Sequence, residues 1–158
     1  MPDSEADQTD RIVAFLRGIG LTVEATALPE DGLLPAMTVR DGTLLYDPDR
    51  LAYPGDLLHE AGHIAVTDAA LRPTTSEFDS DGGDEMAAIA WSYAAALAAG
   101  IDPRVVFHDH GYKGQGAWLA DLFGGGGDIG LPMLQYYGLA ARPGDGDPLY
   151  PAMKRWLR

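Results

Sequence analysis

The pentapeptide His59-Glu60-Ala61-Gly62-His63 constrains this chain more than any other segment. It lies in an apolar run, residues 56–66, whose leucine, alanine and isoleucine residues are spaced as on the buried face of a helix. Two histidines four residues apart on a helix are about 5–6 Å apart at Cβ, so their imidazole nitrogens can converge on one zinc ion. The glutamate after the first histidine points beside that ion, where a general base for water belongs. The motif predicts a zinc-binding helix with Glu60 as the catalytic base.

Neighbouring residues support a helix that is buried against a second element. Tyr53-Pro54-Gly55 is a breaker segment, and Asp56 is suited to the N-cap or first turn of the helix that follows. Gly62 costs a helix about 0.8–1.0 kcal/mol relative to alanine. We therefore expect another backbone or side chain to approach closely at Gly62, which would bury the metal site.

Composition limits both the class of protein and the ligands that a metal could have. With 158 residues, 46% of them hydrophobic, we expect a disordered lead-in over 1–8 and one domain over 9–158. There is no cysteine, so a zinc ion would need His, Asp or Glu ligands, and a reducing compartment is weakly favoured. The formal net charge of −13 argues against binding nucleic acid through a basic face.

The sequence carries no sign of a membrane or secretory segment. Residues 1–7 are acidic and lack the basic and apolar regions of a signal peptide. The longest apolar stretch, 86–99, is too short and too rich in alanine to span a bilayer. We therefore expect a cytoplasmic protein without a membrane partner.

Hydrophobic periodicity and turn residues predict an α+β fold. We expect a small antiparallel sheet packed on the HExxH helix and on a second, buried helix that carries a glutamate. The predicted elements are a helix beginning at Thr9-Asp10 and ending at Gly18–Gly20, a strand over 21–27, a hairpin over 37–46 with an Asp41-Gly42 turn, the buried helix over 84–99, and short helices around 117–123 and 132–141. We expect residues 154–158, a segment with three basic side chains, to end a C-terminal helix, where their charges would complement its dipole.

A catalytic zinc ion usually has three protein ligands and a water, so one ligand remains to be found. The metzincin pattern would continue with glycine and histidine where this chain has Val66 and Ala69. Asp68 would point away from the two histidines, because five residues make about 500° of helical rotation.

Glu85 is the strongest candidate for the third ligand. It enters a helix that is otherwise apolar, where an unpaired buried carboxylate would be very costly. The alternative is a solvated first-turn acid that the helix dipole favours. Asp84, His108 and His110 remain as other possible ligands.

Peptide hydrolysis also needs a donor for the oxyanion that forms when water attacks the carbonyl. Tyr93 is one option, on the same helix as Glu85. His108, His110 and Tyr112 lie in a glycine-flanked loop that could reach into a cleft. We predict His110 or Tyr112 in this catalytic role, and the alternative for the loop is a structural turn.

His59-Glu60-Ala61-Gly62-His63, with Glu85-x-x-Ala88 on a second helix, resembles the gluzincin pattern of zinc metallopeptidases. The order of helix, small sheet, HExxH helix and glutamate helix resembles minimal gluzincins and metallopeptidase domains of the ImmA/IrrE type over residues 10–100. The resemblance implies a zincin-like fold in which His59, His63 and Glu85 bind Zn²⁺ and Glu60 is the catalytic base. No family motif is recognised beyond residue 100.

Two functions are consistent with these features. The first is a zinc metallopeptidase whose peptide or protein substrate binds as an added strand along the edge of the 37–46 hairpin. The second is a zinc-bound module that binds or regulates a partner without hydrolysing it, because 158 residues leave little room for a substrate-binding lobe.

Overall fold

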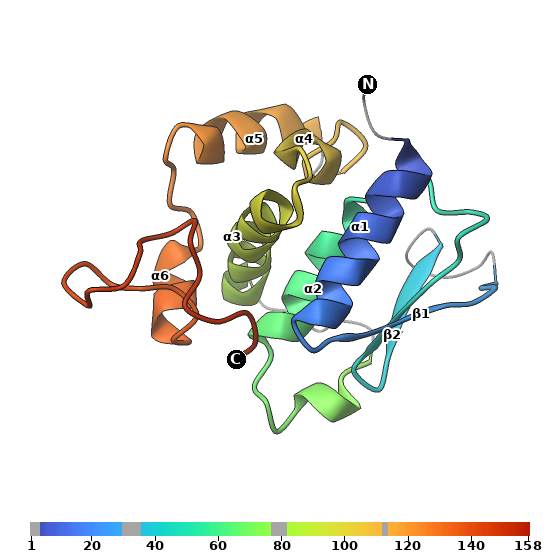
Figure 1. Ribbon diagram of the computed structural model, residues 1–158, viewed down its shortest axis with the longest axis horizontal. Helices are drawn as coiled ribbons and strands as arrows, with labels where there is room; N and C mark the ends of the chain where they lie inside the picture. The colour runs from blue at the N-terminus through green and yellow to red at the C-terminus, as the bar shows by residue number, and fades with distance from the viewer. Residues whose placement is uncertain (1–3, 30–35, 77–81, 112–113) are drawn as a thin grey trace.

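A small sheet and three longer helices form the main part of the computed structural model (Figure 1), which describes residues 4–29, 36–76, 82–111 and 114–158. The first two helices contact the sheet, and the third packs on the second. The helices are α1 (Glu5–Gly18), α2 (Asp56–Val66) and α3 (Gly82–Ala99). The predicted α+β class is confirmed, and the buried side chains of the helices and of the sheet belong to one hydrophobic core. Among the described residues, no helix is long and apolar enough to cross a membrane.

The first helix begins four residues earlier than the sequence predicts. Ser4 is its N-cap and accepts a hydrogen bond from the backbone N–H of Asp7 at 3.1 Å. Acidic residues in the first turn favour the helix further through its dipole. Thr9, expected near the cap, instead donates its hydroxyl to the carbonyl of Glu5 one turn back. Residues 5–8, expected to be disordered, therefore form the first turn of α1.

The three-stranded sheet has the order β1-β3-β2, with β1 (Thr22–Ala25), β2 (Met37–Arg40) and β3 (Thr43–Tyr46). β2 and β3 form the predicted antiparallel hairpin, and positive φ angles of 49° at Asp41 and 75° at Gly42 close it with a two-residue turn. β1 pairs with β3 in parallel, so the sheet is mixed and the expectation of an entirely antiparallel sheet was wrong. The segment between β1 and β3, which includes β2, is long enough for the crossover that a parallel pair requires.

The two central helices, α2 and α3, touch at Gly62. A Cβ atom placed on this glycine would lie 2.9 Å from the carbonyl oxygen of Ala88 and 3.3 Å from Cε3 of Trp91. Both neighbours belong to α3 and are fully buried. The expectation that another element approaches Gly62 closely is confirmed, and the close approach sets the distance between the two helices.

Among the described residues, shorter helical elements complete the fold, one between α2 and α3 in the chain and the others after α3. They are η1 (Arg72–Thr74), α4 (Pro103–Val106), α5 (Gly116–Gly124) and α6 (Leu131–Tyr136). α5 lies where it was predicted, whereas α4 was not predicted. α6 ends before the predicted residue 141, because Gly138 takes a φ of 75° and stops the helix.

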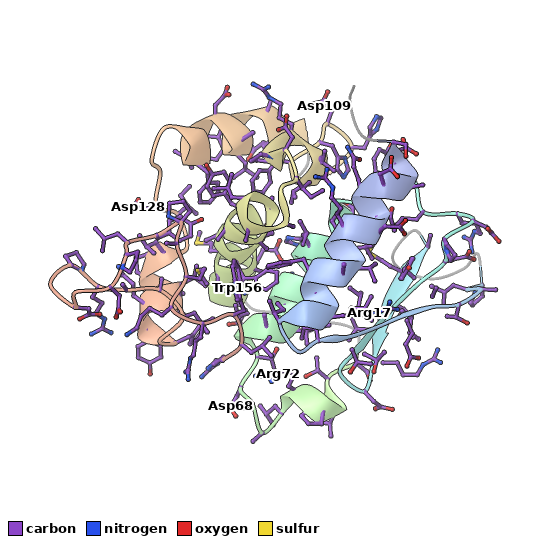
Figure 2. All side chains as sticks on the ribbon, in the orientation of Figure 1. Arg17, Asp68, Arg72, Asp109, Asp128 and Trp156 are labelled. Atoms are coloured by element: carbon purple, nitrogen blue, oxygen red, sulfur yellow. The ribbon has the colours of Figure 1, made fainter. Side chains whose placement is uncertain are left out.

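Residues 154–158 form no helix, so the prediction of a C-terminal helix end was wrong. Figure 2 shows Trp156 close to the centre of the molecule. Its ring meets those of Phe15 on α1 and Trp91 on α3 edge to face, with centroid distances of 5.1 Å and 5.6 Å. Trp91 donates its indole N–H to the carbonyl of Trp156 at 2.9 Å. Aromatic packing against the helices therefore replaces helical hydrogen bonding at this end of the chain.

Candidate metal centre

His59 and His63 lie on one side of α2, one helical turn apart. Their Nε2 atoms are 3.3 Å from each other, and their rings are perpendicular at a centroid distance of 4.8 Å. His63 is 5% exposed, and its side chain is enclosed between α2 and the start of α3. The spacing of the motif thus brings two imidazole nitrogens to one point, as the sequence predicts.

Glu85 reaches the same point from the first turns of α3. Its Oε1 lies 3.1 Å from Nε2 of His59, and its Oε2 lies 2.8 Å from Nε2 of His63. The three residues offer ligand atoms that all lie within 4.8 Å of one another, and they are the one such group among the described residues that could hold a metal ion. Glu85 is half-exposed, yet both of its carboxylate oxygens contact an imidazole, so it is more than a solvated first-turn acid.

The spacing of these atoms fits a divalent cation. Tetrahedral ligands at about 2.0–2.1 Å from a zinc ion lie roughly 3.3–3.4 Å from one another. The two imidazole nitrogens are 3.3 Å apart, and the carboxylate oxygens lie 2.8 and 3.1 Å from them. A cation between the three groups would accept the lone pairs that face one another there. The group could therefore bind a metal ion with small adjustments of side-chain rotamers.

The carboxylate of Glu85 on α3 and the imidazole of His59 on α2 shift each other's pKa. Hydrogen bonds from His59 and His63 hold the pKa of Glu85 well below its usual range. Burial tends to lower the pKa of His59, but the hydrogen bond to Glu85 and the negative charges of Glu85, Glu60 and Asp56 outweigh burial, so the pKa is raised. Without a cation, a protonated His59 would therefore pair with the Glu85 carboxylate.

Glu60 lies beside the two histidines and is almost completely enclosed, with 7% of its surface exposed. Burial raises its pKa above the ordinary value, although the two neighbouring histidines oppose this shift. Its Oε2 atom has no hydrogen-bond partner among the described residues. An enclosed carboxylate with a free oxygen and a raised pKa is suited to accept a proton and to release it again.

A second polar contact, which the sequence did not predict, lies one turn before His59. Nε2 of His108 is 2.6 Å from Oδ1 of Asp56, the first residue of α2. Nδ1 of His108 accepts the backbone N–H of His110, so the proton on this ring is at Nε2 and points to Asp56. Tyr53 stacks on the His108 ring at 4.2 Å. Both ring nitrogens are used, so His108 fastens its loop to α2 and is not a member of the metal group. The available signal was Asp56, which is three residues before His59 and so on the same side of the helix.

Two other predicted candidates, His110 and Asp84, lie outside the metal group. His110 is exposed and stacks on Tyr53 at a centroid distance of 5.2 Å. Asp84 accepts a hydrogen bond from the hydroxyl of Tyr137 at 2.8 Å. Tyr112 lies outside the described residues. The catalytic role expected of His110 or Tyr112 stays a prediction.

Tyr93 packs in the aromatic core, and Asp68 lies in a turn after α2. Tyr93 is buried and stacks on Phe107 and Phe123, so its ring belongs to the aromatic core. Asp68 is exposed and accepts the backbone N–H of Ala70, which makes a turn directly after α2. Asp68 is not a member of the metal group, as its position on the helix predicts, and it lies 4.0 Å from the guanidinium of Arg158.

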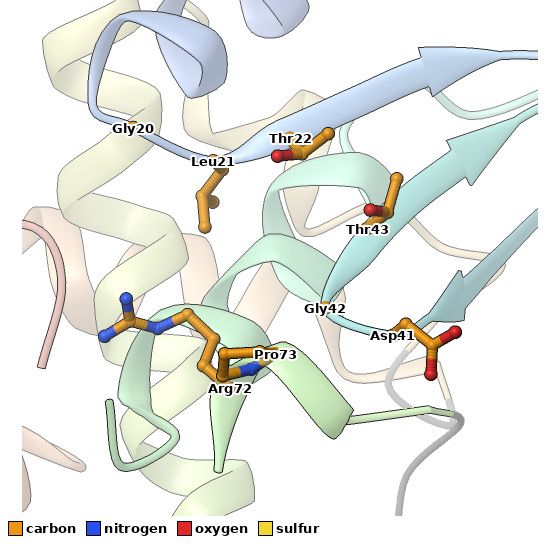
Figure 3. A pocket seen from close by; sticks show the side chains of 8 residues that line it. All are labelled: Gly20, Leu21, Thr22, Asp41, Gly42, Thr43, Arg72 and Pro73. Carbon is orange, nitrogen blue, oxygen red and sulfur yellow. The ribbon is translucent and has the colours of Figure 1, made fainter. Parts of the chain in front are cut away.

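A hollow of about 240 Å³ opens elsewhere on the molecule (Figure 3), between the α1–β1 turn, the β2–β3 turn and η1. Its lining includes Thr22, Thr43 and Asp41. It does not include His59, Glu60, His63 or Glu85. The guanidinium of Arg72 extends away from the other lining side chains in Figure 3 and donates to the main-chain oxygen of Arg158. The hollow is therefore separate from the metal group.

Comparisons of this chain with protein-family models, with curated proteins and with solved structures gave no match.

Proposed function

We propose that this protein is a zinc-dependent metallopeptidase that hydrolyses peptide bonds. The observation that carries the proposal is the meeting of Glu85 with His59 and His63, with the buried Glu60 beside them. Two imidazoles and one carboxylate are the ligand set of many hydrolytic zinc sites, which leave the fourth position for water. Because the chain has no thiolate to offer, imidazole and carboxylate donors favour zinc over softer, sulfur-bound metals.

Glu60 has the properties of the general base in this proposal. When bound, a zinc ion would act as a Lewis acid that makes water acidic near neutral pH. Glu60 would accept a proton from the attacking water, because its Oε2 atom has no partner among the described residues and its surroundings disfavour the charged form. The same carboxyl then delivers the proton to the leaving amine. Enclosure of the carboxyl keeps bulk water from competing for this proton.

The substrate class is a peptide or protein chain in extended conformation. β2 lies at one edge of the sheet in the order β1-β3-β2, so its outer edge could pair with a substrate strand. Main-chain hydrogen bonds along such an edge bind a peptide with little dependence on its side chains. His110 or Tyr112 would stabilise the oxyanion from the loop that His108 fastens to α2.

Metal analysis and peptide cleavage with Glu60→Gln test this function. The purified wild-type protein should hold about one zinc ion per chain and cleave members of a peptide library, measured by mass spectrometry. Glu60→Gln should keep the zinc and lose cleavage by at least about 100-fold, because the base is gone. Glu24→Gln, which changes an exposed glutamate of β1, is the matched control and should cleave normally.

The outcomes separate the two functional classes. Wild-type protein that holds zinc but cleaves no peptide would favour a binding or regulatory module and reject the peptidase. Wild-type protein that takes up no zinc would reject both.

A further inference from the structure

Residue 158 contacts the end of α2, close to the metal group. The backbone N–H of Arg158 donates to the carbonyl of Ala65 at 3.0 Å, and its Nη1 donates to the carbonyl of Val66 at 3.2 Å. Val66 is the last residue of α2 and lies three residues after His63. Carbonyl groups at a helix C-terminus lack partners within the helix and carry partial negative charge, so a guanidinium is a favourable partner for them.

The same guanidinium is also linked to the start of α3. Its central carbon lies 4.1 Å from the ring centroid of Tyr137, at the distance of a cation–π contact. The Tyr137 hydroxyl donates to Oδ1 of Asp84 at 2.8 Å. Asp84 directly precedes Glu85 in the chain. Arg158 is thus connected to α2 just after His63 and, through Tyr137, to α3 just before Glu85.

Neighbouring contacts hold the arginine in this place. Arg72 donates to the main-chain oxygen of Arg158, and Figure 2 shows Arg72 close to the lower end of α2. Trp156 packs on Trp91, the same α3 residue that touches Gly62 of α2. The segment 156–158 therefore lies over the place where the two ligand-bearing helices meet. Its contacts with α2 and α3 are independent of the three predicted ligands.

We propose that Arg158 is a positioning residue that sets the metal affinity of the His59, His63 and Glu85 group. The inference rests on the proposed metal site and adds the residue that holds its two halves together. Metal sites tolerate errors of only a few tenths of an ångström in the positions of their ligands. By linking the end of α2 to the first turn of α3, Arg158 keeps the Glu85 carboxylate within reach of both imidazoles.

Two separate measurements test this role, the affinity for zinc and the stability of the metal-free protein. The dissociation constant for Zn²⁺ is measured by competition with a chromophoric chelator for the wild type, Arg158→Ala, Arg158→Lys and Tyr137→Phe. The visible spectrum of the Co²⁺ form reports the coordination geometry, and the melting temperature of the metal-free protein reports stability alone. Lys154→Ala is the matched control, because Lys154 is a nearby cation whose side chain pairs with Asp147 at 3.6 Å and with neither helix.

We expect Arg158→Ala to weaken zinc binding about tenfold or more and to change the Co²⁺ spectrum, as removal of outer groups that orient ligands does. Tyr137→Phe should shift the affinity in the same direction by a smaller factor. Arg158→Lys should recover part of the affinity, because an ammonium group can still donate to Val66 and contact the Tyr137 ring. Lys154→Ala should bind zinc as the wild type does.

Unchanged zinc affinity in Arg158→Ala, with a lowered melting temperature of the metal-free protein, would overturn the proposal and leave only a structural role. If Arg158→Ala does not fold, Tyr137→Phe decides, and wild-type affinity in that variant overturns the proposal. Wild-type protein without zinc affinity rejects the proposed function and this inference together. A zinc-binding wild type with an unaffected Arg158→Ala rejects the inference alone.

Discussion

Oε2 of Glu85 lies 2.8 Å from Nε2 of His63, although the two residues belong to different helices and a polar loop separates them in the chain. The contact closes a group that the HExxH motif alone leaves incomplete. The formation of this group depends on how α2 and α3 pack. It therefore depends on residues at the helix contact that are not themselves candidate metal ligands.

Glu85→Gln should weaken zinc binding by at least about 100-fold, because an amide is a much poorer zinc ligand than a carboxylate. This loss is larger than the loss expected when a residue that only orients a ligand is removed. The stabilisation that zinc confers on the folded protein should shrink with it, since that stabilisation follows the ratio of free zinc to the dissociation constant. Calorimetric melting with and without zinc measures both effects. Glu24→Gln is the control on the exposed side of β1. Full zinc stabilisation in Glu85→Gln would show that the third ligand lies elsewhere.

The stability of the metal-free protein should fall as pH rises from about 6 toward 8. His59 has a pKa raised above 6.5, so the folded state binds its proton more tightly than the unfolded state does. Its stabilising contribution is complete below the unfolded pKa and is lost as pH rises through the folded pKa. Zinc binding should strengthen over the same interval, because imidazole must lose its proton to bind the metal. Urea unfolding at several pH values, with and without zinc, should show these opposite slopes.

Parallel pH slopes with and without zinc would contradict this assignment of the His59 proton. His59→Gln supplies the control. It should remove most of the fall in metal-free stability between pH 6 and 8, because glutamine does not titrate.

Gly62→Ala should destabilise the metal-free protein by about 1–3 kcal/mol, the usual penalty for overpacking a core. The new Cβ would lie 2.9 Å from the carbonyl oxygen of Ala88, and this backbone atom can move away only if α3 moves. Zinc affinity should fall as well, because the shift carries Glu85 away from α2. Gly18→Ala is the control, since no atom lies within 4 Å of its added Cβ. Urea denaturation and chelator competition measure the two quantities, and equal stabilities of both variants would refute the close approach.

His108→Gln should lower the free energy of unfolding by about 1.5–3 kcal/mol, the range for losing a hydrogen bond to a charged partner. The substitution removes the 2.6 Å contact with Asp56 and the stacking on Tyr53. Zinc affinity should change little, because His108 is not a metal ligand in this arrangement. Asp109→Asn, at an exposed neighbouring position, is the control for stability. A large loss of zinc affinity in His108→Gln would place this histidine in the metal shell instead.

Local sequence signals predicted the elements that depend on neighbouring residues. The hairpin follows from Asp41-Gly42, and the need for a close neighbour follows from Gly62. The four-residue spacing of the two histidines places them on one side of α2. Glu85 was also identified from sequence, because a carboxylate at the head of an apolar helix requires a partner.

Sequence reasoning failed where the partner of a segment lies far away in the chain. The parallel pairing of β1 with β3 depends on a crossover and not on alternation within the strand. The charges of residues 154–158 suit a helix end, but Trp156 and Arg158 instead contact three helices from elsewhere in the chain.

The residues of one helix were enough to indicate a possible metal site, because the types and the spacing of candidate ligands within a helix are local properties. The contacts of His63 with Glu85, of Asp56 with His108, and of Arg158 with the end of α2 arise only when the whole chain folds. These relations depend on the packing distance between helices. That distance follows from the shape of the whole core, which no short segment specifies.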